Sequence, residues 1–95
     1  MEYILFIHNN TDAVTTEDQW LSFFTTANNS GVFQGGSEIS NQCQIGNKPV
    51  QKITNNIVGI MRFEPDDKTK ILALLEKHPV IIHGGTLELC EMPKS

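Results

Sequence analysis

The alternation of apolar and polar positions divides the chain into strand-like and helix-like segments. Short apolar runs rich in β-branched and aromatic residues predict strands, whereas apolar residues that recur every three or four positions predict helices. Strands are predicted at residues 3–8, 32–39, 56–64 and 86–92. One helix is predicted after the first strand, with its start at residues 15–19 and its end at residues 28–31. A second helix is predicted after the third strand, with its start at residues 65–67 and its end at residues 78–79.

Local signals mark the ends of both predicted helices. Thr16 and Gln19 have the spacing of a capping box, and Gly31 suits the left-handed position that follows a helix. The second helix is expected to end at His78, because the residue before a proline avoids helical geometry. The first helix carries an apolar stripe that we interpret as core first and pocket wall second: Trp20, Phe23, Phe24 and Ala27.

This order of elements predicts an α+β fold of the ferredoxin-like βαββαβ type, formed by residues 1–95 as a single domain. Such a sandwich has an antiparallel sheet with strands one and three in its centre and both helices on one face. The glycine pair at 35–36 lies inside the second strand and predicts a bulge or a close backbone approach. Residues 40–55 are expected to form a loop or a ragged hairpin connection, in which residues 48–53 could extend one of the strands. Residues 80–83 are expected to form an apolar connection.

The two strands predicted to be central are apolar on both faces. When helices cover only one face of a sheet, the other face is expected to be polar, and the last strand, at 86–92, follows that alternation. The strands at 3–8 and 56–64 do not, so a second layer is expected on the open face. A homodimer packed sheet to sheet would supply it. The alternative is that the loop at 40–55 folds over this face.

Composition narrows the classes of partner and location. The chain has 95 residues and a net charge of −4, and its seven basic residues are scattered along it. The absence of a basic stripe disfavours nucleic acid and anionic membrane surfaces as partners. The apolar run at 3–7 is too short for a signal peptide, so we expect a cytoplasmic protein in which Cys43 and Cys90 are free thiols.

Four segments resemble the YCII-related (DGPF-domain) family, whose members are small dimeric α/β-barrel proteins. They keep the order and spacing of that family over nearly the whole chain: Tyr3–Ile7, Gly31–Ile39, His78–Pro79 and Gly84–Leu89. The resemblance implies a ferredoxin-like protomer, a dimer, and a ligand pocket between sheet and helices near the subunit interface. Some members resemble enzymes that act on lactones or halogenated hydroquinones. The Asp-Gly-Pro-Phe segment and the histidine of the first helix are both absent here, which argues against carrying over a catalytic pair.

Two polar side chains on the predicted central strands are candidates for a catalytic or a ligand-binding residue. His8 ends the first strand beside a turn, where it could act as a general acid or base, or simply mark the point at which the strand reaches solvent. Arg62 interrupts an apolar strand and could hold the carboxylate of a small anionic ligand. Its other interpretation is an ion pair with one of three acidic residues, namely Glu38, Glu64 or Glu88.

The second strand and the last turn supply the remaining candidates for ligand contact. Gly35, Gly36, Ser37 and Glu38 could bring backbone donors and a carboxylate to a pocket, although a bulged turn explains them equally well. His83 precedes the turn at the second glycine pair. The histidines lack the spacing of a helical metal site, and no helix follows the glycines closely enough to cradle a phosphate. The sequence therefore predicts no metal and no cofactor.

Three functions remain open from the sequence. The favoured one is a small-molecule-binding or regulatory dimer without catalysis, because few titratable residues are available and the family histidine is absent. The alternative is a small enzyme for an organic acid, lactone or ring compound, with His8 as the proton shuttle and Arg62 as the anchor. The third is a structural dimer with a vestigial pocket. Fold alone does not decide between them.

Overall fold

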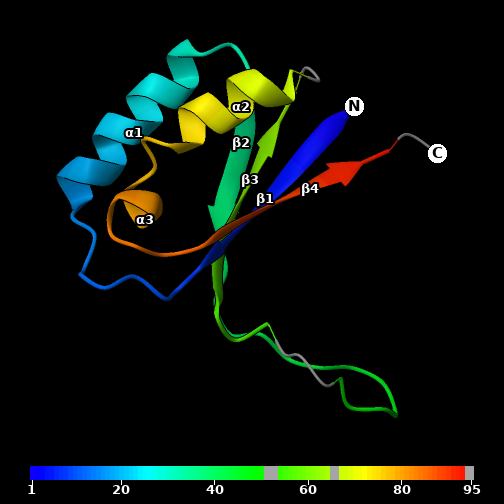
Figure 1. Ribbon diagram of the computed structural model, residues 1–95. Helices are drawn as coiled ribbons and strands as arrows, with labels where there is room; N and C mark the ends of the chain where they lie inside the picture. Colours follow the sequence, from blue (N-terminus) through cyan, green and yellow to red (C-terminus); the bar gives the residue numbers. More distant parts are fainter. Residues whose placement is uncertain (51–53, 65–66, 94–95) are drawn as a thin grey trace.

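The computed structural model describes residues 1–50, 54–64 and 67–93. Its elements follow the predicted order, with one additional short helix near the C-terminal end (Figure 1). They are β1 (Glu2–His8), α1 (Glu17–Asn29), β2 (Phe33–Glu38), β3 (Ile57–Phe63), α2 (Lys68–Leu75), α3 (Pro79–Ile82) and β4 (Leu87–Met92).

The strands form one antiparallel sheet in the order β2-β3-β1-β4, so β1 and β3 are central as the sequence predicts. The helices lie together on one side of this sheet (Figure 1). The described chain is therefore an α+β protein with a four-stranded antiparallel sheet, an arrangement compatible with the ferredoxin-like fold. No described helix has both the length and the apolar character needed to cross a membrane.

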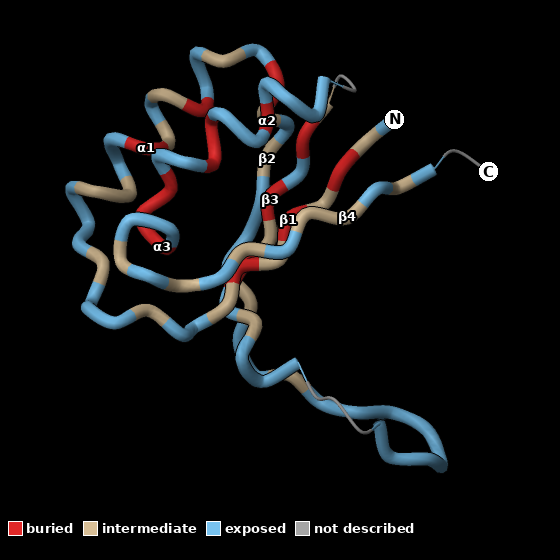
Figure 2. Tube along the Cα trace, in the orientation of Figure 1, coloured by how far each residue is buried: buried red, intermediate tan, exposed pale blue. Residues whose placement is uncertain are grey.

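The core lies between the sheet and the helices, where the buried residues gather (Figure 2). Every second residue of β1 points to this side, and Leu5 at its centre is fully buried. It is paired with Met61 of β3, which is also buried, while Phe23 and Ile71 close the core from α1 and α2. The period-two pattern of β1 and the helical stripe of α1 thus meet in one apolar layer.

The helix signals in the sequence have the predicted geometry. The Thr16 hydroxyl accepts a hydrogen bond from the Gln19 backbone N–H at 3.2 Å, and the Gln19 side chain accepts one from the Thr16 N–H at 2.8 Å. This reciprocal pair is the expected capping box. Gly31, just beyond the helix, has φ +78°, a conformation that glycine adopts without the steric cost met by other residues.

The short helix α3 replaces the apolar connection that the sequence predicts at residues 80–83. His78 is its N-cap, and the imidazole Nδ1 accepts a hydrogen bond from the Val80 N–H at 3.1 Å. Pro79 occupies the first helical position, where its fixed φ is favourable and its missing N–H costs nothing. The His-Pro pair therefore does more than end α2, because it also begins α3.

The outer face of the sheet, opposite the helices, carries half-buried apolar side chains. Ile4 and Phe6 of β1 lie there, and Phe6 is paired with Ile60 of β3. The described part of the long loop, residues 39–50 and 54–56, runs away from the sheet as an extended arm (Figure 1). Ile45 in this arm is 95% exposed. Within the described residues, the loop therefore does not fold over the outer face.

Candidate functional site

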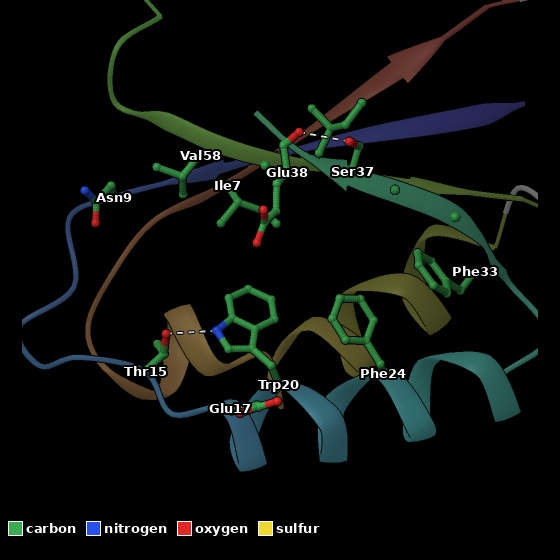
Figure 3. A pocket seen from close by; sticks show the side chains of 14 residues that line it. Ile7, Asn9, Thr15, Glu17, Trp20, Phe24, Phe33, Ser37, Glu38 and Val58 are labelled. Carbon is green, nitrogen blue, oxygen red and sulfur yellow. Dashed lines mark hydrogen bonds between the residues drawn. The ribbon is translucent and has the colours of Figure 1, made fainter. Parts of the chain in front are cut away.

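A cleft of about 880 Å³ lies between α1 and the paired strands β2 and β3 (Figure 3). One wall is aromatic and consists of Trp20 and Phe24 from α1 with Phe33 from β2. The other wall is the backbone of β2 and β3 together with the side chain of Glu38. A helix and a sheet edge held apart by large rings leave room for a small molecule, and cavities of this size are typical of ligand sites.

The aromatic wall is held in a defined geometry. Trp20 and Phe24 are one helical turn apart, and their rings stack with centroids 5.8 Å apart at an angle of 28°. The ring of Phe24 also contacts that of Phe33, with 6.0 Å between the two ring centroids. The indole N–H of Trp20 donates a hydrogen bond to the Thr15 hydroxyl at 2.8 Å (Figure 3). This bond fixes the orientation of the indole, so the three rings present a continuous apolar surface.

A β-bulge in β2 turns Glu38 toward the cleft. Phe33 is paired with Phe63, but the register then shifts by one residue, and Glu38 is paired with Gly59. Because successive strand residues alternate between faces, one extra residue moves Glu38 to the helix side, where Gly59 has no side chain to compete for space. Figure 3 shows the carboxylate of Glu38 directed toward the indole of Trp20. The bulge therefore gives the cleft its carboxylate.

The two glycines of β2 make this geometry possible. Gly35 has φ +120°, a conformation open to glycine and strained for other residues. A Cβ at Gly36 would lie 2.3 Å from the carbonyl oxygen of Ile60, so the two strands approach too closely there for any side chain. Both interpretations of the glycine pair from the sequence, a bulge and a close backbone approach, are therefore confirmed.

The structure separates the predicted site residues into two groups. Gly35, Gly36, Ser37 and Glu38 line the cleft, although the Ser37 hydroxyl turns away and donates a hydrogen bond to the Glu38 carbonyl oxygen at 2.9 Å. The other candidates, which are His8, Arg62 and His83, are not among the residues that line it.

His8 and Arg62 lie on the outer face of the sheet rather than beside the cleft. His8 contacts the carboxylate of Glu88 on the neighbouring strand β4 through its Nε2 atom. Arg62 is exposed and paired with Ile4, four residues before His8 on β1. Four residues of extended strand span roughly 13 Å, so the two side chains are not neighbours. The structure therefore does not bring together His8, the predicted proton shuttle, and Arg62, the predicted anchor for a ligand.

His83 contacts residues of α1 and of the loop that precedes α1. Its Nε2 atom lies 3.0 Å from the side-chain oxygen of Gln19, the same oxygen that accepts the capping-box hydrogen bond. Its carbonyl oxygen accepts a hydrogen bond from the Asp12 N–H at 2.8 Å. His83 thus joins the end of α3 to the start of α1 and to the preceding loop.

His78 is a residue whose environment the sequence does not reveal. It is fully buried behind the aromatic wall, with its ring 4.8 Å from that of Trp20 and 4.6 Å from that of Phe23. Burial lowers its pKa from 6.5 to about 4, because the charged form is poorly solvated there. Its Nδ1 atom accepts the helix-cap hydrogen bond, while Nε2 has no hydrogen-bond partner among the described residues. The side chain is therefore neutral near pH 7.

The charges around the cleft are of one sign. Glu17 and Glu38 are its acidic residues, and the described residues that line it include no lysine, arginine or histidine. Within the described ranges, no group of three or more His, Cys, Asp or Glu side chains is placed to hold a metal ion. The arrangement suits recognition of a flat apolar ring, with a carboxylate available to accept hydrogen bonds or to face a positive charge.

No protein-family model matches this chain, and no curated protein matches it. One solved structure has a similar fold: 5-chloro-2-hydroxyhydroquinone dehydrochlorinase from Burkholderia phenoliruptrix, in complex with 2,5-dihydroxybenzoquinone. The TM-score is 0.56, and the match covers 100% of this chain and 96% of that chain. The likeness is one of fold. At 8% identity it does not extend to individual residues.

Proposed function

We propose that this protein binds a small ring compound in the cleft between α1, β2 and β3, and that it acts as a noncatalytic binding or regulatory dimer. The observation that carries the proposal is the aromatic wall of Trp20, Phe24 and Phe33 along a cavity of about 880 Å³. Apolar, aromatic-lined clefts with a few polar groups are the usual form of small-molecule sites.

Two further observations support a ring compound as the ligand. The cleft lies between the sheet and a helix, which is where the resemblance to the YCII-related family places a pocket. The dehydrochlorinase of similar fold is named for a substituted hydroquinone and was solved with a dihydroxybenzoquinone. Three neighbouring aromatic rings offer the flat surface on which such a ring would stack.

The dimer in this proposal is supported by the outer face of the sheet. Ile4, Phe6 and Ile60 form an apolar surface there, and the described part of the loop runs away from it. A second copy packed sheet to sheet would cover this surface, because a two-fold axis brings the same patch of both chains together. The arm at residues 39–50 would then project past the interface, where its exposed Ile45 could contact the partner.

Tryptophan fluorescence provides a direct test, because Trp20 is the only tryptophan in the chain and lines the cleft. Titration with substituted phenols and benzyl compounds is expected to change the emission in a saturable way. A Phe24→Ala variant loses part of the stacking surface, worth about 0.5–1.5 kcal/mol, and should bind roughly 2- to 10-fold more weakly. Leu21→Ala, at an exposed position of the same helix, is the matched control and should bind like the native chain.

The proposal fails if no compound in the panel gives a saturable change in the native protein. It also fails if Phe24→Ala and Leu21→Ala bind with the same affinity as the native chain. In that case the ligand does not contact the aromatic wall.

An enzyme remains the second candidate because of the contact between His8 and Glu88 on the outer face. A carboxylate beside an imidazole orients the ring, which suits a general acid or base. An enzyme of this kind would lose turnover in a His8→Ala variant with little change in affinity. A binding protein would keep its affinity for the cleft ligand in the same variant, since His8 lies on the other side of the sheet.

A further inference from the structure

The carboxylate of Glu38 is directed into the cleft, and no basic residue is among the described residues that line this cleft. The bulge in β2 fixes its direction, and the neighbouring Gly59 leaves the space around it open. No described basic side chain forms an ion pair with it, and the described residues lining the cleft include none. A carboxylate in this position is a fixed negative charge next to the place where a ligand would lie.

The aromatic wall opposite Glu38 also favours positive charge. The face of an aromatic ring carries the negative part of its quadrupole, and tryptophan attracts cations most strongly of the three aromatic residues. Trp20 is held in place by its hydrogen bond to Thr15, and Phe24 stacks beside it. The Glu38 carboxylate is directed toward the indole (Figure 3), so a cation that enters the cleft is attracted by the carboxylate and by each ring face that it reaches.

The other charges of the chain, taken together, also favour a positively charged ligand in the cleft. Glu17, at the start of α1, is the second acidic residue of the cleft, and the net charge of the chain is −4. Arg62, the residue from which the sequence analysis expected an anionic ligand, lies on the outer face of the sheet. An anion entering the cleft would thus meet repulsion from near and distant charges, whereas a cation would be attracted.

We propose that the cleft selects ring compounds that carry a positive charge, namely aryl-alkyl amines or quaternary ammonium compounds. The ring stacks on Phe24 and Phe33, and the cationic group lies between the Glu38 carboxylate and the indole of Trp20. This inference rests on the proposed function, since it names the class of ligand for the same cleft.

Three probes of similar size and different charge test the inference: benzyltrimethylammonium, benzyl alcohol and benzoate. Affinities are measured by Trp20 fluorescence at two salt concentrations. The native chain is expected to bind the cation at least about tenfold more tightly than the alcohol, and benzoate most weakly. Because Glu38 is exposed, the preference should shrink as salt is raised.

Two variants separate a local effect of Glu38 from an effect of net charge. Glu38→Gln keeps the shape of the side chain and is expected to reduce the preference for the cation over the alcohol to less than about threefold. Glu91→Gln makes the same change in net charge at an exposed position on β4, at the opposite edge of the sheet, and should leave the preference intact.

The outcomes distinguish this inference from the proposed function. Equal binding of the cation and the alcohol by the native chain overturns the charge preference, while the ring-binding cleft stands. A preference that persists in Glu38→Gln overturns the role of Glu38. If none of the three probes changes the emission in a saturable way, the cationic ligand class is overturned. If substituted phenols also give no change, the cleft itself is overturned as a ring-binding site.

Discussion

We expect the native chain to dimerise through the outer face of the sheet, and we expect a Phe6→Asp variant to stay monomeric at the same concentrations. Phe6 is at the centre of the outer face, on a central strand, between Ile60 of β3 and Glu88 of β4. In a two-fold dimer the substitution buries two carboxylates, one from each chain, close to the axis. Burying an ion without a partner costs several kcal/mol, and each 1.4 kcal/mol weakens association tenfold. The dissociation constant should rise by a factor on the order of 1,000 or more.

Analytical ultracentrifugation over a range of protein concentrations measures this effect. Leu21→Asp is the matched control, because it introduces the same charge at an exposed position of α1, away from the outer face. It should leave the dimer intact. Circular dichroism must show that both variants are folded. A native chain that stays monomeric at high concentration, or a Phe6→Asp variant that still dimerises, would contradict sheet-to-sheet packing.

The stability of the protein is expected to fall as the pH is lowered from about 6.5 toward 4, because His78 is buried as a neutral side chain. Its folded-state pKa is about 4, whereas the unfolded chain takes up the proton near pH 6.5. Between these values the unfolded state binds more protons, so acid favours unfolding. For a single group with these two pKa values, the free energy of unfolding drops by roughly 2–3 kcal/mol between pH 7.5 and pH 4.5.

A His78→Asn variant isolates this contribution. The asparagine side chain can still accept the hydrogen bond from the Val80 N–H that begins α3, and asparagine is a favoured N-cap residue without a titrating group. Urea denaturation of both proteins at pH 7.5 and pH 4.5 compares their losses of stability. The variant is expected to lose less stability than the native chain. Equal losses would show that His78 is protonated in the folded state as readily as in the unfolded one.

The order of the elements and the identity of the central strands were predictable because they follow from local patterns. The period-two run in β1 and the helical stripe in α1 each specify a buried face without any long-range information. Thr16, Gln19 and Gly31 act within one turn of chain, and their roles as cap residues were predicted correctly. The sheet order then follows from the short list of topologies open to two linked βαβ units.

The cleft was only partly predictable, because it depends on register. The glycine pair of β2 indicates a bulge, but the sequence does not say which partner each later residue acquires, and this decides that Glu38 faces the helices. Trp20 and Phe24 belong to the same stripe as Phe23, yet only Phe23 is fully within the core. Trp20 and Phe24 are partly buried beside the core and line the cleft.

The remaining differences between the predicted and the observed structure arise from contacts between segments that are distant in the sequence or from a helix that is very short. Glu88 was considered as a partner for Arg62, but the register of β1 with β4 places it beside His8 instead. The helix α3 is not apparent in the sequence, because Pro79–Ile82 is too short to show a helical period. His78 was interpreted as a helix end, and its burial depends on how α3 packs against α1.

Nuclear magnetic resonance shows directly whether the ligand lies in the cleft between α1, β2 and β3. The ¹⁵N-labelled protein is titrated with the benzyl compound that binds most tightly in the fluorescence assay. If the ligand binds there, we expect the resonances of the Gly36 and Gly59 backbone amides and of the Trp20 indole N–H to shift together, with the same saturation. Shifts that concentrate on His8 and Glu88 of the outer face, while the Trp20 indole does not move, would contradict it.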